Sequence, residues 1–174
     1  MRKCAIIFVL LSLLLSACSK SSTGNKNTSA ATAPASIEAK DSEGNSALLR
    51  AVNNGDTNEI RRLVEAGADV NSTSNSGVTP LMNAAGMGNK EAVEFLIQKG
   101  ADVNHRTAGN YTPLMQAALV GQGEIVKLLL QAGADPSVKD AGGRTALTYA
   151  QDQKHEDIAQ VLKQKMGSET AGKK

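Results

Sequence analysis

Apolar residues along most of this chain follow a helical spacing that returns at a fixed interval. One apolar stripe lies in residues 93–97, and the same stripe returns in residues 126–130. A shorter stretch that is rich in alanine comes before each stripe, in residues 81–85 and 114–118. Spacings of three and four residues place side chains on one face of an α-helix. The pattern therefore predicts pairs of short amphipathic helices.

A second repeating pattern marks the start of each pair. Four tripeptides are separated by a constant interval, which is the period of the repeat: Ser46-Ala47-Leu48, Thr79-Pro80-Leu81, Thr112-Pro113-Leu114 and Thr145-Ala146-Leu147. A fixed period in the low thirties is typical of stacked supersecondary units, none of which can bury its apolar face alone. We predict an all-α solenoid with the units 41–73, 74–106, 107–139 and 140–166.

The residue types at the unit boundaries predict where each helix begins and ends. Thr79 can cap the first helix of its unit, and Pro80 suits the first helical position. Gly88 stands between the two helices, where a tight connection needs a positive φ, and Gly100 follows the second helix as a left-handed cap. These types recur one period later. Glycine also recurs in a hairpin-like turn between units, where the third unit has Asn110.

The N-terminus differs from the rest of the chain in composition. A positive start at residues 1–3 is followed by an apolar run at 5–15, which is too short to span a bilayer. The sequence Leu15-Ser16-Ala17-Cys18 resembles the lipobox of bacterial lipoproteins. This resemblance implies a signal peptide at 1–17, lipid on Cys18 and, because Ser19 follows, an outer-membrane location facing the periplasm. Several acyl chains anchor a protein stably.

The segments on either side of the predicted units are polar. Residues 18–40 lack a periodic apolar pattern and are expected to form a disordered tether that carries the lipid. Residues 167–174 are expected to be a disordered tail. Cys4 would leave with the signal peptide and lipid would occupy Cys18, so no disulfide is expected.

The predicted units resemble the ankyrin family, whose repeat of about 33 residues consists of two helices and a hairpin-like turn. The family usually has His after the Thr-Pro-Leu tripeptide, where this chain has Leu49, Met82, Met115 and Thr148. We therefore expect contact between units to depend more on burial than on polar links. The end units carry polar residues where inner units have apolar residues or glycine, which is typical of caps. These are Glu59, Arg62, Lys154 and Lys163.

Residues that could carry chemistry are few. His105 and His155 occupy non-equivalent positions and are expected to be solvated surface residues rather than metal ligands. Asp69, Asp102 and Asp135 follow helix ends and are expected to accept hydrogen bonds from local backbone amides, as are Asn71 and Asn104. No catalytic, cofactor-binding or metal motif is present. A formal charge of +2 without a basic run argues against nucleic acid.

The ankyrin resemblance implies that partners bind the concave side, formed by the turn tips and the exposed face of each first helix. That register selects ten positions: Asn53, Asn54, Val78, Met87, Tyr111, Leu119, Val120, Arg144, Asp152 and Gln153. The inner two units contribute apolar residues and the outer two polar ones, and an apolar centre with a polar rim is the anatomy of a protein interface. Tyr111 is the expected anchor, with Arg106 and Arg144 supplying charge at the edge. Alternatively, Leu119 and Val120 pack against neighbouring helices.

These observations favour a lipid-anchored, monomeric adaptor or scaffold of the cell envelope, which binds a protein partner through its concave face and reaches the membrane through Cys18. The alternative is a periplasmic immunity protein that binds and blocks a toxin. An enzyme is the third class, and no residue constellation supports it.

Overall fold

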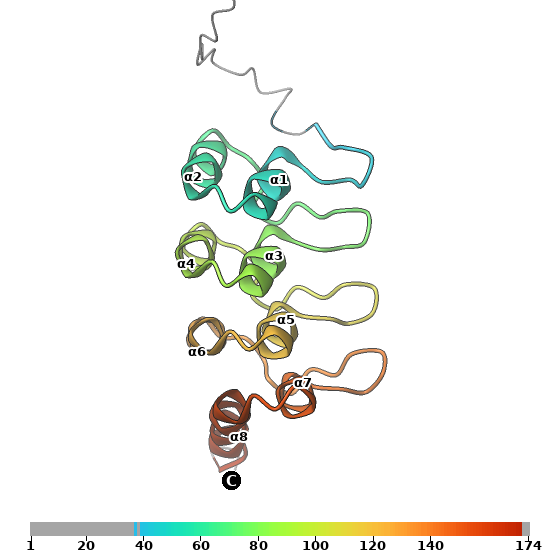
Figure 1. The fold of residues 1–174 in the computed structure, drawn as a ribbon, viewed down its shortest axis with the longest axis vertical. Helices are drawn as coiled ribbons and strands as arrows, with labels where there is room; N and C mark the ends of the chain where they lie inside the picture. Colours follow the sequence, from blue (N-terminus) through green and yellow to red (C-terminus); the bar gives the residue numbers. More distant parts are fainter. Residues whose placement is uncertain (1–36, 38, 172–174) are drawn as a thin grey trace, which may run out of the picture. The chain divides into compact units, whose positions relative to one another are not determined.

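The computed structural model describes residue 37 and residues 39–171, with side chains as far as residue 167. This part of the chain contains eight helices and no strand, so the all-α prediction is confirmed. The helices occur in consecutive pairs (Figure 1): α1 (Ala47–Asn53) with α2 (Thr57–Glu65), α3 (Pro80–Met87) with α4 (Lys90–Gln98), α5 (Pro113–Val120) with α6 (Gly123–Gln131), and α7 (Ala146–Asp152) with α8 (Glu156–Ala171).

The helix pairs stack into two columns. The first helices α1, α3, α5 and α7 form one column, and the second helices form the other (Figure 1). Neighbouring first helices pack more closely on each other than neighbouring second helices do. Small side chains explain the difference, because Ala84, Ala85, Ala117 and Ala118 are fully buried in α3 and α5.

The predicted caps start the first helices. Oγ1 of Thr79 accepts a hydrogen bond from the backbone nitrogen of Met82 at 3.3 Å, and Oγ1 of Thr112 accepts one from Met115 at the same distance. A proline follows each threonine in the first helical turn. This arrangement satisfies backbone N–H groups that have no partner within the helix. The sequence-based prediction of these caps is confirmed.

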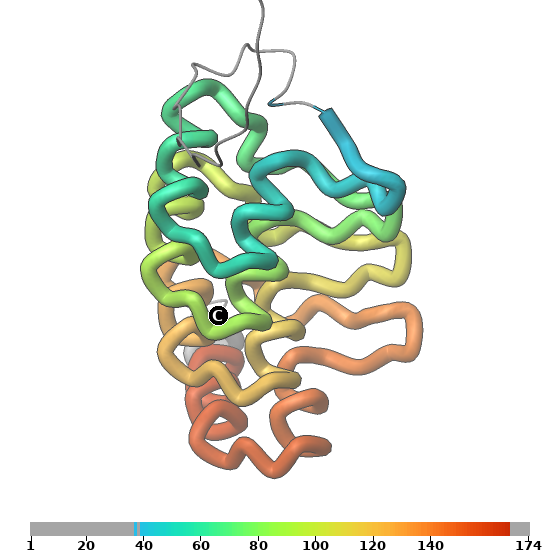
Figure 2. The backbone as a smooth tube through the Cα atoms, turned by 45° about the horizontal axis from the view of Figure 1, so that its top comes forward, coloured from blue at the N-terminus to red at the C-terminus, as the bar shows by residue number. Residues whose placement is uncertain are grey.

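The connection between adjacent pairs is a hairpin-like turn, and Figure 2 shows these turns projecting from the same side of the stack. In the third turn, Thr107 N donates to Tyr111 O at 3.1 Å, and Asn110 has a φ of 56°. Glycine has a φ of 77° or 78° at the equivalent position of the other three turns. Asn110 thus adopts the left-handed conformation predicted for it. Neighbouring turns bond to each other, as Asn75 N does to Glu43 O at 3.0 Å.

Apolar side chains occupy the position after the tripeptide, as predicted. Leu49, Met82 and Met115 are almost fully buried. In the last unit, Oγ1 of Thr148 accepts from the backbone nitrogen of Thr145 at 3.4 Å and completes a capping box.

Asparagine side chains link successive units, which corrects their predicted local role. Oδ1 of Asn71 accepts from Asp102 N at 2.8 Å, and its Nδ2 donates to Gly100 O at 3.2 Å. Asn104 makes the equivalent bonds to Asp135 N and Gly133 O. Each asparagine bonds the backbone that follows the second helix of the next unit. Polar links therefore join the units in addition to burial.

Both ends of the helical array extend beyond the predicted boundaries. Ile37 is buried and belongs to the hydrophobic core, and Nζ of Lys40 donates to Thr73 O at 3.0 Å, so contacts begin before residue 41. At the other end, α8 continues to Ala171. This finding corrects the predicted disordered tail for residues 167–171. Residues 18–36 and 38 of the predicted tether and residues 172–174 of the predicted tail lie outside the described residues.

Candidate protein-binding surface

Two exposed apolar side chains stand out on the column of first helices. Met87 ends α3 and is 50% exposed, and Val120 ends α5 and is 44% exposed. Each precedes a left-handed glycine that turns the chain toward the second helix. Because they are one period apart, they occupy the same position in neighbouring pairs. We call Met87 and Val120 the Met87–Val120 patch.

The surroundings of this patch are polar and mostly uncharged. The equivalent positions in the outer pairs are the exposed residues Asn54 and Gln153. Gly86, which precedes Met87, is covered by the amide of Gln116: a Cβ on Gly86 would lie 2.6 Å from Nε2 of Gln116. An apolar centre with a polar rim is therefore present on this face. Other predicted rim residues, Asn53 and Asp152, are also exposed.

Leu119 and Val78, the other aliphatic residues predicted for the surface, are half-buried. Leu119 packs against the hydrophobic core, as the alternative interpretation of this residue expected. Val120 does not, because nearly half of it is exposed. Val78 closes its hairpin turn, where its backbone nitrogen donates to Oγ of Ser74 at 3.2 Å.

Tyr111 is packed within the protein, which differs from its expected role as an open anchor. Its ring meets that of Tyr149 edge to face, with 5.5 Å between ring centroids and 90° between planes. Its hydroxyl is buried and has no hydrogen-bond partner among the described residues. Burial, followed by the nearby Tyr149, raises the pKa of the Tyr111 hydroxyl to about 12. Contact between the last two units thus accounts for an aromatic residue at this turn.

Arg144 is also engaged within the chain. Its guanidinium lies 4.4 Å from the ring centroid of Tyr149, and its Nε and Nη2 each donate to Oδ2 of Asp140 at 3.2 Å. The predicted edge charge is thus paired with a carboxylate, although half of the Arg144 side chain is exposed. Arg106, the other predicted edge charge, is exposed.

Asp140 is the centre of this network at the last hairpin turn. Its Oδ2 also accepts from the Tyr149 hydroxyl at 2.6 Å, and its Oδ1 accepts from the backbone nitrogens of Gly142 and Arg144 at 2.8 Å. The Tyr149 hydrogen bond, followed by the Arg144 amide, lowers the pKa of Asp140 to about 2. Charge-assisted bonds of this kind favour the ionised carboxylate. Neither Asp140 nor Tyr149 was predicted from the sequence.

The residues expected to be structural behave largely as predicted. Oδ1 atoms of Asp69, Asp102 and Asp135 accept from backbone nitrogens two residues later, at 2.9, 2.9 and 2.8 Å. His105 corrects its prediction, because it is half-buried and its Nε2 lies 3.0 Å from Gly77 O. His155 is half-buried too. Cys18 lies outside the described residues.

The described residues lack two further kinds of feature. They contain no group of three or more His, Cys, Asp or Glu side chains that could hold a metal ion. Within the same part of the chain, no helix combines the length and the apolar composition needed to cross a membrane.

Comparison with protein families agrees with the fold. A model of ankyrin repeats in three copies matches residues 10–107, and a second ankyrin model, of many copies, matches residues 96–150. The chain belongs to the ankyrin repeat family. Ankyrin repeats generally mediate protein–protein interaction and are typically non-catalytic modules. No curated protein matches the chain.

Proposed function

We propose that this ankyrin repeat protein is a lipid-anchored adaptor or scaffold of the bacterial cell envelope that holds a protein partner on its Met87–Val120 patch. The observation that carries the proposal is the exposure of these two side chains in neighbouring pairs. They are the large apolar residues with the highest exposure among the described residues, and neither belongs to the hydrophobic core or to the side chains packed against it.

The composition of the first-helix column supports a protein as the partner. Apolar side chains at the centre of a surface, ringed by polar groups that exclude water, supply most of the affinity in protein interfaces. At the positions equivalent to Met87 and Val120, the outer pairs carry the exposed polar residues Asn54 and Gln153. A partner would therefore bury the centre of the column and leave the outer pairs as the rim. Tyr111 would act indirectly, by fixing the turn of the third unit against Tyr149.

Photo-cross-linking tests the position of this surface. A photoreactive amino acid at position 87 of the full chain, expressed in its native host, should give one discrete cross-linked product. The matched control is position 98, because Gln98 is exposed at the end of α4 in the same unit, on the column of second helices. Met87→Asp should lower the amount of partner protein recovered with the chain by about tenfold or more, because a charge would be buried at the interface. Gln98→Asp should leave that amount unchanged. A product from position 98 and none from 87 would place the binding surface on the second helices.

The lipid anchor rests on the lipobox resemblance at residues 15–18 and has a separate test. Cys18→Ser should abolish incorporation of labelled fatty acid and release the protein from the membrane fraction, because no acyl acceptor remains. Labelling of this variant at the wild-type level would contradict the proposed anchor. That result would not bear on the Met87–Val120 patch, which the cross-linking experiment tests.

A further inference from the structure

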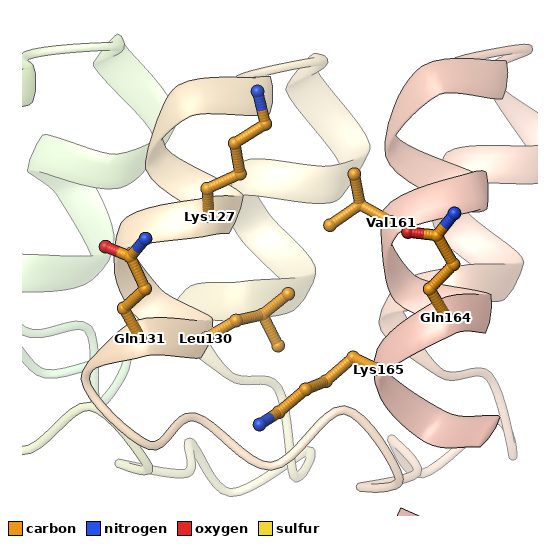
Figure 3. Close-up of a pocket in the computed structure, with 6 residues that line it drawn as sticks. All are labelled: Lys127, Leu130, Gln131, Val161, Gln164 and Lys165. Atoms are coloured by element: carbon orange, nitrogen blue, oxygen red, sulfur yellow. The ribbon is translucent and has the colours of Figure 1, made fainter. Parts of the chain in front are cut away.

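A groove lies between α6 and α8, on the column of second helices and away from the Met87–Val120 patch. Its volume is about 390 Å³, and it is lined by Lys127, Leu130, Gln131, Val161, Gln164 and Lys165. Figure 3 shows the side chains of Leu130 and Val161 extending into the space between the two helices. The floor is therefore apolar, and lysines stand at its edges.

The groove follows from the side chains that occupy one repeated position. Phe95, Leu128 and Val161 lie one period apart from each other, on α4, α6 and α8. In the second unit the phenylalanine is buried, with the guanidinium of Arg61 from α2 lying 4.7 Å from its ring centroid. Because second helices pack less closely than first helices, the smaller Val161 leaves space open next to α6. The smaller residue at this repeated position thus leaves a groove beside the last helix pair described.

Opposite charges flank the valine along α8. A second hollow of about 240 Å³ adjoins the groove, shares Lys127 and Val161 with it, and includes Asp157. Asp157, Val161 and Lys165 follow one another at intervals of four residues, so they lie along one stripe of the helix. At a rise of 1.5 Å per residue, each charged residue lies about 6 Å along the axis from Val161.

This order of charges is self-complementary. When two copies of α8 lie antiparallel, with the two Val161 side chains on the two-fold axis, Asp157 of each copy faces Lys165 of the other. Isologous contacts of this type are the commonest in symmetric oligomers. An acidic peptide would meet Lys127 and Lys165 in the groove, but it fits less well because Asp157 would repel it at the other end of the stripe.

We propose that the α6–α8 groove is a homodimer surface, in which α8 of a second copy docks antiparallel against α8 and α6. The half-buried Val161 of each copy supplies the apolar contact, because Leu130 is itself buried within its own chain. The two Asp157–Lys165 pairs set the orientation, since interfacial charges contribute mainly to specificity. The dimer replaces the monomer that was expected from the sequence. The column of first helices stays open for a different partner, so the two surfaces work independently.

Charge reversal in full-length chains tests this arrangement. Two copies of the protein with different C-terminal tags are expressed together and captured from detergent extracts through one tag. Wild-type copies should capture each other. Asp157→Lys paired with itself, and Lys165→Asp paired with itself, should each lower capture by about tenfold or more, because like charges then face each other.

The decisive sample combines the two variants. Asp157→Lys in one copy and Lys165→Asp in the other restore both opposite-charge pairs, so capture should return close to the wild-type level. Controls that make matched charge changes elsewhere on α8, Glu156→Lys and Lys163→Asp, should behave as wild type. Thermal melting by circular dichroism checks that every variant is folded. The proposal would be overturned if wild-type copies did not capture each other, or if the single variants captured each other as well as wild type does. It would also be overturned if capture by the mixed pair stayed as low as that by the single variants.

Discussion

The inner units at 74–139 and the C-terminal unit at 140–171 share one backbone fold but differ in the residues that join their two helices. In the inner units, glycines with φ values of 76° and 83° join the two helices. At the equivalent position of the last unit, Lys154 adopts a φ of 61°. The inner units thus rely on residues that suit the backbone, whereas the last unit keeps the backbone and accepts a less favourable side chain.

The hairpin turns show the same contrast. Hydroxyl groups of Ser74 and Thr107 each accept one backbone amide at 3.2 Å in the inner turns. Carboxylates stand at the two end turns, where Asp41 and Asp140 each accept two amides through Oδ1. An inner turn has a neighbour on both sides, but an end turn has a neighbour on only one. Stronger local hydrogen bonds at the ends compensate for the missing neighbour.

The largest expected effect tests the packing side of this comparison. Leu96→Ala removes a fully buried side chain between α2 and α6 and should reduce the free energy of unfolding by about 2–5 kcal/mol, because a cavity remains. Leu162→Ala in α8 removes an equally buried side chain at the end of the stack, where the structure can relax, and should cost less. Denaturant unfolding of the full chain measures both. An equal or larger cost for Leu162→Ala would show that the last unit is packed as rigidly as the inner ones.

A smaller effect is expected from the side-chain network of the last unit. Tyr149→Phe keeps the ring but removes the hydrogen bond to Asp140, and should reduce stability by roughly 1.5–3 kcal/mol, as for other hydrogen bonds to charged groups. Hydrogen exchange should show the loss of protection in residues 140–162 rather than in 74–106. Uniform loss across both regions would mean that the two parts unfold together.

Acid should weaken the same network. The pKa of Asp140 is lowered from 3.8 to about 2 in the folded protein, so its contribution is complete above pH 3.8 and is lost as the pH falls toward 2. In Asp140→Asn, the stability of residues 140–162 should therefore vary less with pH over that interval. Unfolding curves at several pH values measure the difference. If stability changed equally steeply with pH in the wild type and in Asp140→Asn, a depressed pKa of Asp140 would be contradicted.

The smallest expected effect has the opposite sign. Lys154→Gly should stabilise the protein by about 0.5–1 kcal/mol, because glycine adopts a positive φ without the steric cost borne by lysine, and this gain exceeds the added chain entropy. The reverse change in an inner unit, Gly88→Lys, should destabilise it, since Gln122 lies where a Cβ would be placed. Thermal unfolding of both variants measures this pair. A destabilised Lys154→Gly would show that the lysine side chain contributes a contact of its own.

Features that repeat with the period were predictable, and those that depend on unlike positions were not. Thr79, Pro80 and Asn110 were placed correctly because each shares its type, or its conformational tolerance, with residues one period away. The contact between Tyr111 and Tyr149 joins positions that are not a whole period apart, which alignment of the repeats never compares. The candidate patch was predicted only in part for the same reason. Periodicity gives the face of a residue, but the size of its neighbour decides whether Leu119 or Val120 is covered.

The length of α8 was missed for a related reason. Gly167 and the polar residues around it resemble a frayed end, yet residues 167–171 include no proline that would stop the helix. The bridging role of Asn71 was missed because composition favours local turns for asparagine, and the direction of its side chain depends on the next unit.

The asparagine links have a consequence for how such a chain can lengthen. Each link joins an Asn side chain of one unit to a Gly carbonyl and an Asp amide of the next, so the segment 74–106 contains both halves of the joint. A tandem duplication of that segment would copy the linking asparagine, Asn104, together with Gly100 and Asp102, whose backbone bonds the asparagine of the preceding unit. No residue at the junctions would need to change. The chain is therefore suited to growth by copying an internal segment, whereas Ser137 bonds its own turn through Asp135 and ends the series.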